Sequence, residues 1–239
     1  MRRVVLSLTS VVFVFAAGMA PAATTYTGTI TNVPGDGDGD LVTRHQWDDS
    51  PASLTWTVSD NEDGTWHYQY VFRHAGADTS HMILELSENV RSLELILNPQ
   101  GDYGSMELGQ GSDSGNPEIP GDFTQAVKFD ETWGQATTLD FDIPRAPVWG
   151  DFYAKGGGNP QVVAWNSGFV AGESDAVPSN DPTHIAAHDG VEYVNGLAHL
   201  LVPDSDVPQV PPAPEPATLA AAALGLAGLG AYLRKRRLA

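Results

Sequence analysis

The strongest constraint on this chain is a pair of neighbouring segments, Ser53–Ser59 and Thr65–Arg73, in which apolar and polar residues alternate with a period of two. That period is the side-chain repeat of a β-strand buried on one side. Asp60–Gly64 between them has turn composition, so the segments predict an antiparallel hairpin with one aromatic-rich face in a core. That face comprises Leu54, Trp56, Val58, Trp66, Tyr68, Tyr70 and Phe72.

Short strand-like runs continue along residues 23–205, separated by turn residues and without a convincing amphipathic helix. About ten such strands predict an all-β domain, an antiparallel β-sandwich with a jelly-roll arrangement as one option. Gln100–Asp122 is long, polar and rich in Gly, Ser and Asp, and we expect it to be an inserted loop. The other expected strands are Thr24–Thr31, His81–Ser87, Ser92–Leu97, Phe123–Phe129, Thr137–Ile143, Val148–Ala154, Val162–Asn166 and Val194–Val202.

Charge and cysteine content exclude several classes of function. Half of the 12 basic residues lie at the two ends of the chain, which leaves six basic against 30 acidic residues, a formal charge of −24, between about residue 23 and Pro216. Such a body repels nucleic acid and anionic membrane surfaces, so we expect no nucleic-acid partner. The absence of cysteine rules out disulfides, thiolate metal sites and cysteine nucleophiles.

The N-terminal 22 residues have the layout of a secretory signal peptide. Two arginines precede the apolar run Val4–Ala17, and Ala20-Pro-Ala22 supplies small residues at the expected cleavage site. At 14 residues the apolar run is short for a membrane span. We therefore expect export through Sec-type machinery and a mature chain that begins near residue 23.

Asp36, Asp38 and Asp40 alternate with glycine after the first expected strand. Carboxylates on a flexible backbone suit calcium, so a calcium site is one interpretation of this segment. An EF-hand is excluded, because Leu41 and Trp47 occupy the positions that would need Gly and Glu. The other interpretation is a flexible loop without a metal, and no other cofactor is expected.

Three tryptophans stand near turns, where an exposed ring could stack on a sugar face: Trp133, Trp149 and Trp165. Packing in the core or at a sheet edge is the competing interpretation. The segment around Trp149 also carries Asp151 and Phe152, which makes it the most suggestive of the three.

Catalytic motifs are weak. Acidic pairs such as Glu85, Glu88 and Glu94, or Asp140 and Asp142, could serve glycoside hydrolysis at the right separation, but chance pairs are expected among 30 acids. His184 and His188 have the i, i+4 spacing of zinc ligands, although Ile185 stands where a zincin has Glu. Neither a Gly-x-Ser-x-Gly elbow nor a phosphate-binding loop is present. We therefore expect a protein that is not an enzyme, with a secreted polysaccharide-active enzyme as the alternative.

The C-terminal end has three parts. A proline-rich linker (206–216) ends in Pro214-Glu215-Pro216, an uncharged apolar run follows at 217–233, and the tail 234–239 begins with four cations: Arg234, Lys235, Arg236 and Arg237. Seventeen residues reach about 25 Å as a helix, near the lower limit for a bilayer span. The cations would hold the tail in the cytoplasm.

This order resembles the PEP-CTERM sorting signal of exported proteins in Gram-negative bacteria, over roughly residues 211–238. The resemblance implies processing by an exosortase, with Pro214, Glu215 and Pro216 as the recognised residues. It also implies an association with exopolysaccharide and biofilm. The predicted protein is thus anchored for a time in the inner membrane and then sorted to the cell surface or matrix, where its role would be structural or adhesive; a secreted carbohydrate-binding protein is a further alternative.

Overall fold

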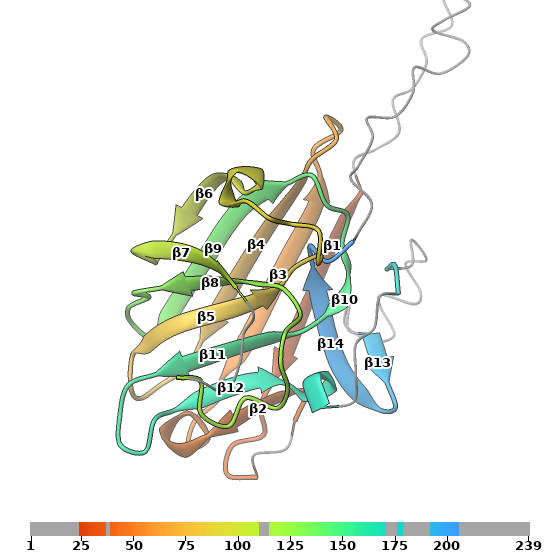
Figure 1. Ribbon diagram of the computed structural model, residues 1–239. Coiled ribbons are helices and arrows are strands. Elements are labelled where there is room, and N and C mark those ends of the chain that lie inside the picture. Colours follow the sequence, from red (N-terminus) through yellow and green to blue (C-terminus); the bar gives the residue numbers. More distant parts are fainter. Residues whose placement is uncertain (1–23, 37–38, 110–114, 171–175, 179–191, 206–239) are drawn as a thin grey trace, which may run out of the picture. The chain divides into compact units, whose positions relative to one another are not determined.

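The computed structural model describes residues 24–36, 39–109, 115–170, 176–178 and 192–205. Over this part of the chain, two larger antiparallel sheets lie in layers, with a smaller three-stranded sheet beside them (Figure 1). The described residues contain no α-helix and only three short 3-10 turns: η1 (His45–Trp47), η2 (Leu93–Leu95) and η3 (Ser167–Val170). The predicted all-β class with antiparallel sheets is therefore confirmed.

The first sheet has five strands and is built around the predicted hairpin. β3 and β4 pair in register from Ser53 opposite Arg73 to Asp60 opposite Trp66. The turn between them uses positive φ at Glu62 and Gly64, a conformation that glycine adopts without strain. In order across the sheet, the strands are β1 (Thr25–Thr31), β3 (Ser53–Asp60), β4 (Trp66–Arg73), β9 (Ala136–Ile143) and β6 (Leu97–Gly101).

The second layer is a six-stranded sheet, and the small sheet lies at its flank. The six strands in order are β2 (Leu41–Arg44), β12 (Val163–Asn166), β11 (Phe152–Gly156), β5 (Thr79–Glu85), β8 (Ala126–Asp130) and β7 (Ser105–Gly109). The small sheet consists of β10 (Val148–Gly150), β14 (Leu197–Val202) and β13 (Glu192–Val194). All pairings are antiparallel, so hairpins and loops suffice to connect them.

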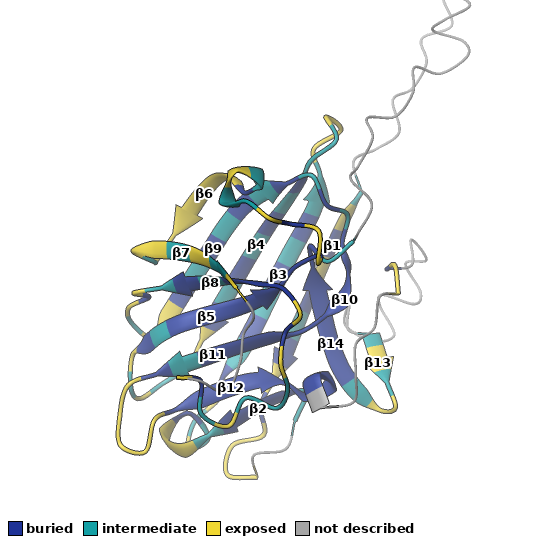
Figure 2. Cartoon of the chain, in the orientation of Figure 1, coloured by how far each residue is buried: buried dark blue, intermediate teal, exposed yellow. Residues whose placement is uncertain are grey.

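The main core lies between the two larger sheets. Rings from opposite layers meet there: Phe72 of β4 lies 6.3 Å from Phe152 of β11, and Phe129 of β8 lies 5.7 Å from Phe141 of β9, centroid to centroid. The predicted apolar face of the hairpin is buried throughout. The alternation of dark blue and teal along β3, β4 and β9 follows this pattern (Figure 2).

Four sequence predictions need correction. Ser92–Leu97 is mostly a 3-10 turn capped by the Ser92 hydroxyl, not a strand. The expected loop Gln100–Asp122 contains the end of β6 and all of β7. β7 is an edge strand, and polar residues are common on exposed edge strands. Val148–Ala154 is two strands, and Val194–Val202 turns at Asn195 and Gly196 between β13 and β14. The sequence pattern does not predict β2, because four residues are too few for a visible period.

A segment between β7 and β8 covers the outer face of the six-stranded sheet. His81 Nε2 lies 2.8 Å from Asn116 Oδ1, and the Tyr153 hydroxyl donates to the carbonyl of Pro117 at 2.7 Å. Beneath the segment is a small second core that includes Phe123 and Trp165. Burial, aided by the charge of Lys128, lowers the pKa of His81 to about 4, so this side chain is neutral at pH 7.

Ser87 holds the C-terminal end of the described body. Its backbone N–H donates to the carbonyl of Pro203 at 3.3 Å, and its hydroxyl donates to the carbonyl of Ser205 at 2.6 Å. Because Ser87 follows β5 closely, these bonds join the chain beyond β14 to a central strand of the six-stranded sheet. Ser87 is fully buried, and its bond to Ser205 is partly buried.

Candidate functional site

A pocket of about 460 Å³ opens at the β2 edge of the six-stranded sheet. It lies where β2 and β12 meet the turn between β13 and β14. Among its lining residues are two that the sequence singled out separately, Asp40 as a calcium ligand and Trp165 as a sugar contact. Among the described residues, the lining is Gly39, Asp40, Val42, Arg44, Trp165, Ser167, Gly196 and Leu197. We call this the edge pocket.

Strand register brings Arg44 over Trp165. Val42 of β2 lies directly opposite Trp165 of β12, and Arg44 stands two residues further along the same face. The Arg44 guanidinium carbon is 5.2 Å from the centroid of the Trp165 ring, within the range of a cation–π contact. Arg44 also donates to the carbonyl of Thr43 at 3.1 Å. The guanidinium is thus presented at the pocket with its position fixed.

The acidic side of the edge pocket is Asp40. The Tyr193 hydroxyl of β13 donates to Asp40 Oδ2 at 3.0 Å, and the backbone N–H of Ser167 donates to the Asp40 carbonyl at 2.9 Å. Ser167 Oγ in turn accepts from the N–H of Ala198 at 2.8 Å. A carboxylate, a phenol and a guanidinium beside an aromatic wall are the polar groups with which proteins orient hydroxylated ligands.

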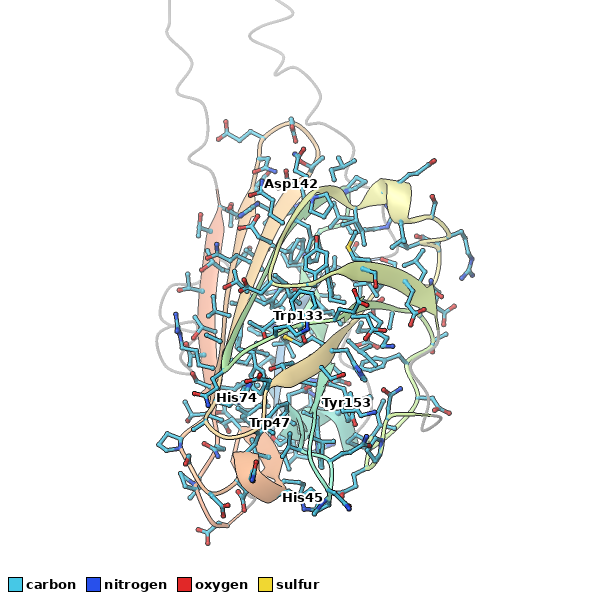
Figure 3. The ribbon with its side chains drawn as sticks, turned by 90° about the vertical axis from the view of Figure 1, so that its left-hand side faces the viewer. His45, Trp47, His74, Trp133, Asp142 and Tyr153 are labelled. Atoms are coloured by element: carbon cyan, nitrogen blue, oxygen red, sulfur yellow. The ribbon has the colours of Figure 1, made fainter. Side chains whose placement is uncertain are left out.

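Among the three candidate tryptophans, Trp133 is the exposed one, with 64% of its surface accessible. It lies on the turn between β8 and β9 and is labelled in Figure 3. Backbone bonds fix both sides of this turn: Thr132 N–H donates to Ser80, and Thr79 N–H donates to Gly134. The ring is therefore presented to solvent on a restrained loop.

The two other tryptophans are buried, which agrees with the packing interpretation of these residues. Trp149 is 3% exposed and belongs to the main core, because β10 turns it inward. Trp165 is 6% exposed, so only its edge at the pocket can meet a ligand. The suggestive segment around Trp149 is therefore packing, as the competing interpretation held.

Asp140 and Asp142 lie on the outer face of the five-stranded sheet, beside His67. His67 Nδ1 lies 2.8 Å from Asp142 Oδ1 and donates to it, and Asn98 donates to the other oxygen at 2.8 Å. Burial alone would raise the pKa of Asp142, but the bonds from Asn98, His67 and Asn61 hold that pKa below its ordinary value. Asp142 is thus a fully ionised, well-bonded carboxylate near one end of the sheet (Figure 3).

A buried polar cluster was not foreseen from the sequence. Asn166 donates to Asp151 Oδ1 at 2.6 Å and to the carbonyl of Ala198 at 2.9 Å, and its own oxygen accepts from the N–H of Phe152 at 2.9 Å. His199 Nδ1 lies 3.0 Å from the same Asp151 oxygen. Glu85, one of the acids considered for catalysis, accepts from the Asp151 N–H at 2.9 Å. The cluster ties β5, β11, β12 and β14 together in the interior.

The other acids and histidines considered in the sequence analysis form no cluster within the part of the chain that the structure describes. Glu88 and Glu94 are exposed on the surface. Within the described ranges, no group of three His, Asp or Glu side chains could hold a metal ion. Asp38, His184 and His188 lie outside the described residues, so the calcium and zinc hypotheses stay predictions.

The predictions for the two ends of the chain also concern residues that the structure does not describe. The described residues include no helix long and apolar enough to cross a bilayer. The predicted signal peptide, residues 1–22, and the predicted transmembrane segment, residues 217–233, fall outside them, as does Pro214-Glu215-Pro216.

The acidic all-β body is followed in the sequence by a proline-rich, an apolar and a basic segment. Residues 212–237 match the family model described as the PEP-CTERM protein-sorting motif, so the chain carries this motif and its resemblance is confirmed. The motif marks the protein for export and surface sorting and implies an exosortase as its processing partner. No curated protein and no solved structure matches the chain.

Proposed function

We propose that this is an exported surface protein with a structural or adhesive role in the exopolysaccharide matrix. The observation that carries the proposal is the PEP-CTERM match over residues 212–237. Sec-type export, an intermediate anchored in the inner membrane through residues 217–233, and release to the surface or matrix follow from the predicted order of segments. The formal charge of −24 between about residue 23 and Pro216 supports a soluble extracellular body.

Replacing Pro214, Glu215 and Pro216 by alanine tests the sorting step. Prolines pre-extend the chain and remove backbone donors, so alanines would let this segment adopt other conformations and would delete the carboxylate. We expect the protein to accumulate in its unprocessed form in the membrane fraction, measured by immunoblotting of cell fractions. The matched control replaces Pro208 and Pro211, which precede the matched residues 212–237, and should be processed normally. Normal processing and location of the tripeptide variant would refute the sorting proposal.

We infer that the adhesive contact is made by the edge pocket, with a saccharide as its ligand. Support comes from the chemistry of the lining: Asp40 accepts hydrogen bonds from hydroxyl groups, Arg44 donates them, and Trp165 supplies an apolar edge. A volume of about 460 Å³ lies within the range of small-molecule sites. Trp133 would be a separate, accessory contact.

Arg44→Ala tests the edge pocket. The loss of the guanidinium removes a charged hydrogen-bond donor to the ligand, which is worth roughly 1.5 kcal/mol or more, or about tenfold in affinity. The measurement is a glycan array followed by calorimetric titration of the best ligand. Arg73→Ala is the matched control, since Arg73 is an exposed arginine at the end of β4 on the other sheet. Equal affinity of the two variants would remove the pocket from the proposal.

A polysaccharide-active enzyme is the alternative from another class. It needs two carboxylates facing a cleft. Among the described acids, Asp140 and Asp142 share His67 on the outer face of the five-stranded sheet, and Glu107 and Asp130 share Lys128. Glu85 accepts from the backbone of Asp151 in the interior. None of these acids lines the edge pocket, so no observation favours this alternative over adhesion.

A further inference from the structure

The outer face of the five-stranded sheet carries an unusual run of hydroxyl groups. Every outward position of β1 and β3 is Thr or Ser, while the positions between them point into the core. These eight residues are Thr25, Thr27, Thr29, Thr31, Ser53, Thr55, Thr57 and Ser59. Three of the four on β1 are exposed, and those on β3 are partly exposed. We call this surface the hydroxyl face.

Register sets the eight side chains in matched pairs. Thr25 stands opposite Ser59, Thr27 opposite Thr57, Thr29 opposite Thr55, and Thr31 opposite Ser53. The Thr29 and Thr55 hydroxyls are 3.0 Å apart and hydrogen-bonded to each other. Neighbouring strands are about 4.8 Å apart and alternate residues about 6.7 Å apart along a strand, so the face is a regular two-row lattice about 20 Å long.

The hydroxyl face carries no charge, although the body around it is strongly acidic. Each residue at those eight positions is neutral, whereas the next strands of the same sheet carry His67, Arg73, Asp140 and Asp142 on their outward side. Between them, Gln69 and Thr138 are polar and uncharged, and Val71, opposite Thr55, is apolar. No large apolar side chain points outward from β1 or β3, so the surface lacks the anchors of a protein interface.

These features indicate which kind of ligand the hydroxyl face could bind. A hydroxyl group both donates and accepts hydrogen bonds, so a row of hydroxyls is complementary to a ligand surface that is itself rich in hydroxyl groups. Neutrality removes the repulsion that an acidic surface would exert on an anionic polymer, but it offers no attraction for one either. The regular spacing suits a ligand that repeats, and a length of about 20 Å spans several sugar rings of an extended chain.

We propose that the hydroxyl face binds an extended, uncharged polysaccharide laid along β1 and β3. Each hydroxyl contact with such a chain replaces a contact with water and contributes little alone. The lattice supplies several contacts at once on a rigid sheet, and a polymer engages them together. This site deepens the proposed matrix role and rests on it for its biological setting, but it shares no residue with the edge pocket.

The test is a double variant, Thr27→Val with Thr57→Val, in the full-length purified protein. Valine keeps the β-branched shape, so the strands should persist while one facing pair of hydroxyls is lost. The measurement is co-sedimentation with amorphous cellulose and with an insoluble, uncharged β-1,3-glucan. We expect binding to fall about tenfold or more. Thr27→Ser with Thr57→Ser keeps the hydroxyls and should retain binding.

Two control variants distinguish binding at the hydroxyl face from binding at the edge pocket and from a general loss of surface hydroxyls. Thr124→Val removes an exposed hydroxyl elsewhere and should leave binding unchanged. Arg44→Ala locates the contact, because this variant, and not the valine double variant, would lose polymer binding if the edge pocket were the site of the polymer. The proposal is overturned if the wild-type protein sediments with neither polymer, if the valine double variant binds as the wild type does, or if Arg44→Ala abolishes binding while the valine variant does not.

Discussion

Asn166→Ala is expected to remove about 3–5 kcal/mol from the free energy of unfolding. The side chain satisfies the Phe152 N–H, the Ala198 carbonyl and the Asp151 carboxylate, all in the interior. Alanine would leave these groups short of partners in a region that water does not reach, which costs far more than a lost surface bond. Since domains of this size are stable by about 5–15 kcal/mol, the variant should be close to unfolding.

Guanidinium unfolding followed by tryptophan fluorescence measures this effect. The matched control is Asn61→Ala, because Asn61 also donates two side-chain bonds, to Thr65 and Asp142, but is exposed. The control should lose no more than about 0.5–1 kcal/mol. A similar, small loss in both variants would show that the buried cluster is not a main source of stability.

Gly28→Val should be the second large loss of stability, about 3 kcal/mol, with β1 released from the sheet. Gly28 lies in the middle of β1, and the ring of Trp56 on β3 occupies the space that a Cβ atom would need. The cause is this close approach and not a special backbone angle. Valine would push the Trp56 ring, which is 1% exposed, out of its packed position.

A double-mutant cycle isolates that cause. Trp56→Leu vacates part of the space, so Gly28→Val should cost much less in that background than in the wild type. The measurement is the unfolding free energy of the four proteins. A strictly additive result would mean that Gly28 is required for another reason. Gly35→Val serves as a control for glycine replacement where no atom lies within 4 Å, although its positive φ will add some strain.

The sequence revealed the centre of the fold better than its edges. Trp56, Tyr70 and Phe72 repeat with a period that only a half-buried strand produces, and the hairpin follows from local chemistry. Val148–Ala154 resembles one strand because its run of apolar residues is nearly continuous. Asp151 divides it, since its carboxylate is used in the interior by Asn166 and His199, partners that are distant in sequence.

The candidate site could be foreseen only in part. Asp40 and Trp165 stand out in the sequence for unrelated reasons, and the register of β2 on β12 places them in one pocket. Arg44 carries no sequence signal, because its role depends on lying two residues beyond the partner of Trp165. Trp149 stands out in the sequence but is buried in the core. A tryptophan beside a turn residue can be exposed or buried, and only the position of its strand in the fold distinguishes the two.

The hydrogen bonds of Ser87 determine which strands would bear a mechanical load applied to the C-terminal side of the chain. The sorting motif at residues 212–237 follows Ser205 in the chain, so any pull on the motif first reaches the body there. β14 shares only three residue pairs with β10 and three with β13, and such short ladders would open one bond at a time under a peeling load. The bonds from Ser87 to Pro203 and Ser205 meet that load first and pass it to β5, which is paired on both sides. A load applied from the C-terminal side of Ser205 would thus reach the widest sheet before it reached the hairpin at its flank.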